Sequence, residues 1–181
     1  LSGSASAETP SKLARVHRVP THWSPDINAK EALDQLSEWR PDAVIATNFS
    51  HYVGAAARSI ARMGTWNLHK SYLPHYRGMG PSFYALLQGA KRTGATLHKV
   101  AKGIDTGDIL SQVPVEIEPG DTVYTLNQKT WDAGGRMLIE FLEQASAGSI
   151  TSMPQPAGEW PYYTYPTPRD VRQFFAKGLH F

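Results

Sequence analysis

The sequence predicts an α/β domain with a largely parallel sheet, and three observations support this fold class. Short apolar runs that suit buried strands alternate with segments of helical periodicity. The chain has 181 residues, which is enough for one domain with a sizeable core. It is 41% hydrophobic and 19% charged, a balance typical of a globular protein rather than a disordered one.

The composition excludes several kinds of site and partner. The chain has no cysteine, which removes disulfides, thiolate nucleophiles and cysteine-ligated zinc, and which fits a reducing compartment. The net charge is only +2, and no cluster of Lys or Arg marks a nucleic-acid face. No apolar run approaches the length of a membrane span. We therefore expect a cytoplasmic protein without nucleic-acid or membrane partners. The sequence leaves open whether it forms a homodimer.

The first part of the chain predicts a lead-in, a helix and a strand. Residues 1–10 are mostly small and polar, and we expect them to be flexible. Asn28 and Glu31 have the spacing of a capping box, and helical periodicity then continues until Pro41 ends the helix. Residues 43–46 form a short apolar run, which indicates a strand buried on both faces.

Two further helices and a second strand follow. The pattern from Val53 to Arg62 predicts a helix, and Gly64 ends it. Thr65–His69 predicts a second buried strand. Gly80-Pro81 is typical of a helix start, because proline is tolerated in the first turn, and this helix is expected to reach Gly89.

The next part predicts two extended segments and a long helix. Thr93–Lys102 and Asp108–Ile117 are the extended segments, and a glycine-flanked turn joins them. Asp121 or Thr122 is expected to cap the long helix. Gly134-Gly135 predicts a kink or break within it, because each glycine costs about 1 kcal/mol relative to alanine.

Three polar residues stand out among apolar neighbours. Asn67 and His69 are two residues apart on one predicted strand, so their side chains leave the same face, at the end where open α/β sheets bind ligands. Asp105 lies in the glycine-flanked turn, where its carboxylate can point inward. An amide and a protonated imidazole can stabilise an oxyanion, and a carboxylate orients the imidazole and raises its pKa. The group suits acyl transfer, although polar residues on strands more often have structural roles.

Two longer motifs contain these residues. Residues 67–78 read Asn-Leu-His-Lys-Ser-Tyr-Leu-Pro-His-Tyr-Arg-Gly and resemble the N-x-H-x-S-x-L-P-x-Y-R-G signature of the 10-formyltetrahydrofolate-dependent formyltransferases. Residues 93–98 and 103–110 resemble the second signature of that family. The interval between His69 and Asp105 also matches the family's separation between its catalytic His and Asp.

The resemblance implies a three-layer, Rossmann-like formyltransferase domain and a direct transfer without a metal. Asn67, His69 and Asp105 fall on the family's invariant triad. An amine would attack the formyl carbon of 10-formyltetrahydrofolate, Asn67 and His69 would hold the oxyanion, and Asp105 would keep His69 protonated. The family's positions for binding the folate co-substrate fall on Asn48, Phe49, Ser50, His51, Tyr52, Val53, Ala101, Gly103 and Ile104.

The acceptor side is less defined. Ser71, Arg77 and Gly78 are candidate substrate contacts, although Arg77 suits a solvated loop equally well. His98 lies on a predicted strand, which favours a structural role. The tail beyond Met153 is rich in Pro and Tyr and is expected to wrap over the surface, where its aromatic residues suit a hydrophobic clamp or an oligomer contact. No histidine spacing predicts a metal site.

The ends of the chain differ from the family's usual pattern. The resemblance begins near Val16, so residues 1–10 do not supply the first β-α-β portion, and we expect acceptor binding to differ. Too few residues follow Gln144 for the β-barrel of methionyl-tRNA formyltransferases, which favours a small-molecule amine or hydroxylamine: an amino-sugar nucleotide, or a molecule like glycinamide ribonucleotide or hydroxyornithine. We expect a catalytic domain at 11–150 and a packed C-terminal extension at 151–181. The alternatives are a 10-formyltetrahydrofolate hydrolase and a non-catalytic folate-binding or interaction domain.

Overall fold

The computed structural model describes residues 9–148 and 150–181. The expected lead-in lies almost wholly outside these ranges, and its last two residues, Thr9 and Pro10, cap and begin the first helix. No helix within the described ranges is long and apolar enough to span a membrane. The elements in chain order are α1 (Pro10–Val16), α2 (Lys30–Trp39), β1 (Val44–Thr47), α3 (Ala55–Ser59), β2 (Thr65–His69), β3 (Arg77–Gly78), α4 (Pro81–Leu87), β4 (Arg92–Lys99), β5 (Ile109–Glu116), α5 (Val123–Ser146), β6 (Tyr162–Tyr163) and α6 (Pro168–Ala176).

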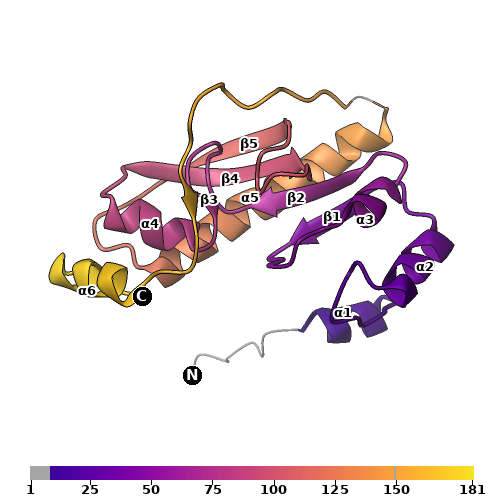
Figure 1. Cartoon of the computed structure of the whole chain (residues 1–181), viewed down its shortest axis with the longest axis horizontal. Helices are drawn as coiled ribbons and strands as arrows, with labels where there is room; N and C mark the ends of the chain where they lie inside the picture. Colours follow the sequence, from indigo (N-terminus) through magenta and orange to yellow (C-terminus); the bar gives the residue numbers. More distant parts are fainter. Residues whose placement is uncertain (1–8, 149) are drawn as a thin grey trace.

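A four-stranded sheet of order β1-β2-β4-β5 lies at the centre of the fold (Figure 1). β1 and β2 are parallel, whereas the pairs β2–β4 and β4–β5 are antiparallel. The α/β class is confirmed, but the sheet is mixed rather than largely parallel. The turn between β4 and β5 is short and places β5 next to β4. Such a short connection joins only antiparallel strands, because parallel strands need a longer crossover.

The two parallel strands differ in burial because of their places in the sheet. β1 lies at an edge, where Val44, Ile45 and Ala46 are half-buried and Thr47 is exposed. The expectation that this apolar run is buried on both faces is therefore wrong, because its side chains stay half-exposed at the open edge of the sheet. β2 has neighbours on both sides and is buried along most of its length, with Trp66 completely covered.

The long helix α5 packs against β4 and β5 and encloses the main core with them. Trp66 of β2 meets Phe141 of α5 edge to face, with ring centroids 5.2 Å apart. The helix continues through Gly134, so the predicted break is wrong. A Cβ at Gly134 would lie 2.9 Å from Cβ of Ala95 and 3.2 Å from a methyl of Leu68. This glycine therefore lets the helix approach the sheet, and the gain in packing offsets its low helix propensity.

One of the two predicted helix caps is confirmed and the other is wrong. Thr122 caps α5 in a reciprocal capping box, as predicted. The capping box predicted at Asn28 and Glu31 is wrong, because α2 begins later and has no side-chain cap. Asn28 instead donates from Nδ2 to the carbonyl of Tyr52 at 2.9 Å and accepts from the backbone N–H of Gly54. It therefore anchors the loop after β1, and α3 beyond that loop is shorter than predicted.

The tail returns along the sheet and packs at its far end. The connection from α5 to β6 passes along β4 and β5 before β6 pairs with β3 (Figure 1). Met153 forms an isolated antiparallel bridge with Ile109 on the way. Phe174 of α6 is completely buried and stacks on Phe83 of α4, with ring centroids 4.5 Å apart. These contacts join the tail to the start of β5, to β3 and to α4.

Candidate active site

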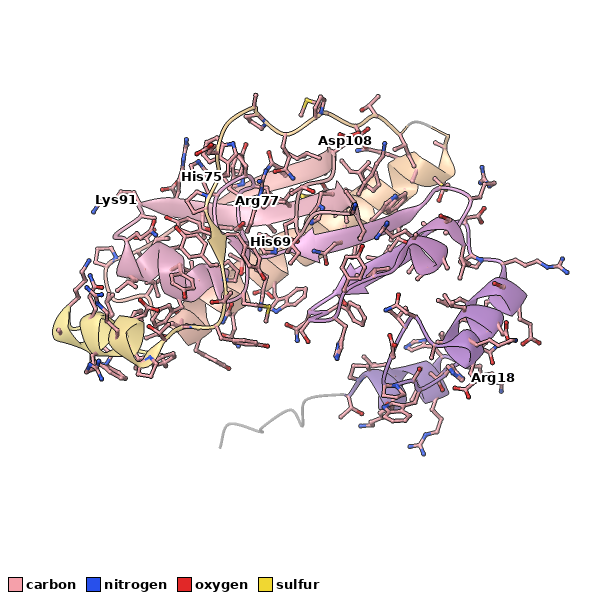
Figure 2. The ribbon with its side chains drawn as sticks, viewed as in Figure 1. Arg18, His69, His75, Arg77, Lys91 and Asp108 are labelled. Atoms are coloured by element: carbon pink, nitrogen blue, oxygen red, sulfur yellow. The ribbon has the colours of Figure 1, made fainter. Side chains whose placement is uncertain are left out.

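The three residues of the predicted triad lie together. Nδ2 of Asn67 donates to Oδ1 of Asp105 at 3.3 Å, and Nδ1 of His69 lies 3.5 Å from Oδ2 of Asp105. His69 and Asp105 are both about nine-tenths covered, with side chains 8% and 10% exposed. His69 lies near the middle of the molecule, at the end of β2 (Figure 2). The chain therefore supplies an amide, an imidazole and a carboxylate in one buried cluster.

The backbone of the turn aims the carboxylate of Asp105 inward. Asp105 has a φ of +50°, in the left-handed region that aspartate tolerates better than most residues. Gly107 allows the turn to close, because a Cβ there would lie only 1.9 Å from the carbonyl oxygen of Lys99. The backbone N–H of Gly78 then donates to Oδ2 of Asp105 at 2.8 Å. β3 thus supplies a backbone donor to the site.

His98 belongs to this cluster, which the sequence did not predict. Its Nε2 lies 3.3 Å from Oδ1 of Asp105 and 3.1 Å from Nδ2 of Asn67, and its side chain is 2% exposed. The register of β2 and β4 places His98 directly opposite Asn67. This register joins residues far apart in the chain, so periodicity alone gave no sign of the contact.

Each histidine directs one ring nitrogen at a backbone carbonyl and the other at Asp105. Nε2 of His69 lies 2.9 Å from the carbonyl of Tyr76, and Nδ1 of His98 lies 2.8 Å from the carbonyl of Lys99. Because a carbonyl only accepts, these two nitrogens carry the protons of the neutral rings. A second proton on either ring would therefore point at the carboxylate of Asp105.

Burial and charge set the protonation of His69 and Asp105. The pKa of His69 lies below 6.5, with burial as the largest cause, although the attraction of Asp105 and the hydrogen bond to Tyr76 both raise it. The charges of His98 and Lys70 lower the pKa of His69 further. Burial would raise the pKa of Asp105, but the hydrogen bond and charges of the two histidines, with a backbone N–H, bring it to about 2. The expectation that Asp105 keeps His69 protonated is therefore wrong for the ligand-free site.

A cavity of about 570 Å³ includes the whole cluster, a volume typical of small-molecule sites. All nine residues at the predicted folate-binding positions line it, and so do all three of the triad. The sequence did not indicate another part of the lining, which comes from the start of α4, from α5 and from the tail: Met79, Gly80, Pro81, Ser82, Phe83, Val123, Asn127, Tyr162, Thr164 and Tyr165.

Two of the three predicted substrate contacts, Ser71 and Arg77, do not line the cavity. Ser71 is completely buried, donates to the carbonyl of His75 at 2.6 Å and does not line the cavity. Arg77 lies beside the tail and donates to Oε1 of Gln155 at 2.8 Å (Figure 2). Of the three, only Gly78 lines the cavity. Within the two described ranges, no group of three or more His, Cys, Asp or Glu residues is arranged to hold a metal ion.

Comparison with known proteins decides the family. A family model described as formyl transferase matches residues 1–142. The chain belongs to the formyl transferase family. Within that family, the methionyl-tRNA formyltransferase of Thermotoga maritima is 39% identical over 145 residues, covering 80% of this chain and 46% of the relative. That of Kosmotoga olearia is 35% identical over 164 residues, covering 90% of this chain and 53% of the relative. The chain thus spans about half the length of these curated relatives.

Solved structures confirm the Rossmann-like formyltransferase fold. Phosphoribosylglycinamide formyltransferase from Bacillus halodurans matches with a TM-score of 0.67 and 29% identity, over 76% of each chain. The formyltransferase PseJ from Anoxybacillus kamchatkensis, solved with UDP-4,6-dideoxy-4-formamido-L-AltNAc and tetrahydrofolate, shares the fold with a TM-score of 0.62. It is 24% identical over 75% of this chain and 69% of its own. Because the relatives include methionyl-tRNA enzymes, the expectation of a small-molecule acceptor is not confirmed.

Proposed function

We propose that this chain transfers a formyl group from 10-formyltetrahydrofolate to an amine. The observation that carries the proposal is the buried cluster of Asn67, His69 and Asp105 inside the 570 Å³ cavity of a formyl transferase family member. The loop at Asn48–Val53 would hold the folate together with Ala101, Gly103 and Ile104, since all of them line the same cavity. The structure of PseJ with tetrahydrofolate supports this choice of donor.

The chemistry follows from the protonation of the free site. The lone pair of the acceptor nitrogen forms a bond to the formyl carbon, and the carbonyl oxygen becomes an oxyanion. The two N–H groups of the Asn67 amide face Asp105 and His98 in the free site, and one of them turns to donate to that oxyanion. His69, neutral because burial lowers its pKa, accepts the proton of the attacking nitrogen. The resulting imidazolium is stabilised by Asp105, 3.5 Å away. His69 then returns the proton to the folate nitrogen as its bond to carbon breaks, which releases tetrahydrofolate and the formamide.

We infer that the acceptor is the amine or hydroxylamine of a small molecule, such as an amino-sugar nucleotide or a molecule like glycinamide ribonucleotide or hydroxyornithine. The 29% identity to a phosphoribosylglycinamide formyltransferase supports this class. The tail also supports it, because Tyr162 and Tyr165 bring aromatic surface to the cavity. On this proposal, residues 11–150 form the catalytic domain and residues 151–181 an extension that completes the cavity, in a cytoplasmic enzyme. The 39% identity to a methionyl-tRNA formyltransferase favours a second acceptor, the amino group of methionyl-tRNA.

A single assay separates these functions. The protein is incubated with 10-formyltetrahydrofolate and, in separate reactions, a nucleotide-linked amino sugar, glycinamide ribonucleotide, hydroxyornithine, methionyl-tRNA or no acceptor. Tetrahydrofolate release is followed by absorbance, and the formylated product is identified by mass spectrometry. Formylation of methionyl-tRNA alone would replace the small-molecule proposal. Formate release without acceptor would indicate a hydrolase, and folate binding without any release would indicate a non-catalytic domain.

A further inference from the structure

One side chain of the tail spans the turn that carries Asp105. Nε2 of Gln155 donates to the carbonyl of Asp105 at 2.8 Å and to the carbonyl of Gly107 at 2.9 Å. The two N–H groups of one amide thus join two carbonyls of the turn that precedes β5. No other side chain in the described ranges donates a hydrogen bond to these two carbonyls.

Arg77 fixes the orientation of the Gln155 amide. Its Nη2 donates to Oε1 of Gln155 at 2.8 Å. Because a guanidinium only donates, the oxygen of the amide must face Arg77 and the nitrogen must face the turn. The next residue, Gly78, donates its backbone N–H to Oδ2 of Asp105 at 2.8 Å. Arg77 lies beside the tail strand, because β3 pairs with β6 (Figure 2). The segment at β3 therefore acts on Asp105 twice, directly and through Gln155.

The tail is anchored on both sides of Gln155. On one side, Met153 exchanges two backbone hydrogen bonds with Ile109, at 2.7 and 2.8 Å. On the other side, β6 pairs with β3, and the N–H of Met79 donates to the carbonyl of Tyr163 at 2.8 Å. Gln155 is half-buried between two exposed prolines, so its side chain turns inward where its two neighbours do not.

The Asp105 turn has little packing that could hold it instead, since Gly107 is its one fully buried residue. Lys102, Gly103, Ile104 and Thr106 are all exposed. Asp105 itself has a left-handed backbone, which costs on the order of 1 kcal/mol for a residue with a side chain. Hydrogen bonds to the turn must therefore hold it, and Gln155 supplies two of them.

We propose that Gln155 is a positioning residue for formyl transfer, which holds the Asp105 turn from the tail and so sets the carboxylate of Asp105 against His69. This inference rests on the proposed function and deepens it, because it makes the tail part of the catalytic arrangement. Gln155 itself does not line the cavity. It acts on the reaction through Asp105, so its loss should change the rate more than the binding of substrates.

The test uses Gln155→Ala and Gln155→Met, with Gln88→Ala as the matched control. Methionine keeps an unbranched side chain of similar length but cannot donate to the two carbonyls. Gln88 also holds the tail through a side-chain amide, by donating to the hydroxyl of Tyr163 at 2.7 Å, but it does not contact the Asp105 turn. In both Gln155 variants kcat should fall on the order of 10- to 100-fold with KM changed much less, because the carboxylate is displaced from His69. Gln88→Ala should keep the wild-type kcat.

A second readout does not depend on turnover. NMR titration of the His69 imidazole should show a lower pKa in both Gln155 variants, because the attraction of Asp105 raises that pKa in the wild type. The other charges facing His69, those of His98 and Lys70, are unchanged in these variants. Thermal melting of each variant, compared with Gln88→Ala, shows whether a loss of activity reflects unfolding. If Gln155→Ala does not fold, Gln155→Met, which keeps the length of the side chain, is used for both measurements.

The outcomes separate the two proposals. A lowered pKa of His69 together with a lower kcat supports the positioning role. A folded Gln155→Met variant that titrates and turns over like Gln88→Ala would overturn it. If no acceptor is formylated by the wild type, the proposed function fails, while the titration of His69 still decides whether Gln155 holds Asp105 in place.

Discussion

Oδ2 of Asp105 lies 3.5 Å from Nδ1 of His69, the one ring nitrogen of His69 that is not engaged by a backbone carbonyl. The other carboxylate oxygen lies 3.3 Å from Nε2 of His98. A second proton on either imidazole ring therefore forms a hydrogen bond to the carboxylate of Asp105. The same carboxylate links the stability of the fold to the chemistry proposed for the cavity.

Asp105→Asn and His69→Ala should each lower kcat on the order of 100-fold or more, because positioned proton transfer contributes about that much to such reactions. Binding of the folate should largely survive, since the loop at Asn48–Val53 is untouched. Stopped-flow kinetics and fluorescence titration with tetrahydrofolate measure the two effects. Unchanged turnover in both variants would contradict the mechanism.

Asp105 should also make stability depend on pH in the acid range. Its pKa is about 2 in the folded protein and 3.8 in its ordinary state, so the unfolded chain binds more protons between these values. The resulting stabilisation, about 2 kcal/mol, is fully present above pH 3.8 and is lost as the pH falls towards 2. Urea unfolding of wild type and Asp105→Asn between pH 2 and 6 measures it. The difference between the two should shrink steadily towards the acid end, and a constant difference would show that the carboxylate is not stabilised by the fold.

His69 adds a second dependence at higher pH with the same sign. Its pKa in the folded protein lies below the ordinary 6.5, so the neutral ring is favoured by folding. Stability from this group is present above pH 6.5 and falls as the pH drops below that value, because the unfolded chain takes up the proton first. His69→Gln should flatten the stability curve in this range. The rate of formyl transfer should rise as His69 loses its proton, with an apparent pKa below 6.5. A rate that falls over this range would contradict neutral His69 as the proton acceptor.

The two adjacent glycines of α5 should respond in opposite ways to alanine. Gly134→Ala would place a methyl 2.9 Å from Cβ of Ala95 and should destabilise the fold by about 1–3 kcal/mol through overpacking. At Gly135 a Cβ meets nothing within 4 Å, so alanine there should stabilise the helix by up to about 1 kcal/mol. Chemical denaturation of the two variants gives both values. Equal effects would mean that α5 does not pack this closely on the sheet.

Several features of the fold could be predicted from local pattern. Thr65–His69 is a strand with the predicted bounds, and Thr122 caps the long helix. The start of α4 at Pro81 is likewise as predicted. Each of these depends on residues within one turn or one strand, where side-chain chemistry and backbone preference act over a few positions. The cap predicted at Asn28 failed because the Asn28 side chain finds its partners in a distant segment, at Tyr52 and Gly54.

The sequence by itself indicated the family and the α/β class, and it predicted the three residues of the triad, because short motifs and local periodicity carry this information. Only the tertiary structure decided that β1 lies at an edge, that Gly134 serves close packing rather than a break, and that burial outweighs Asp105 in setting the pKa of His69. It also decided that Gln155 reaches Asp105 from 50 residues away. These features depend on distances between segments that are remote in sequence. Such distances follow from the register of the strands and the path of the tail, which no local pattern encodes.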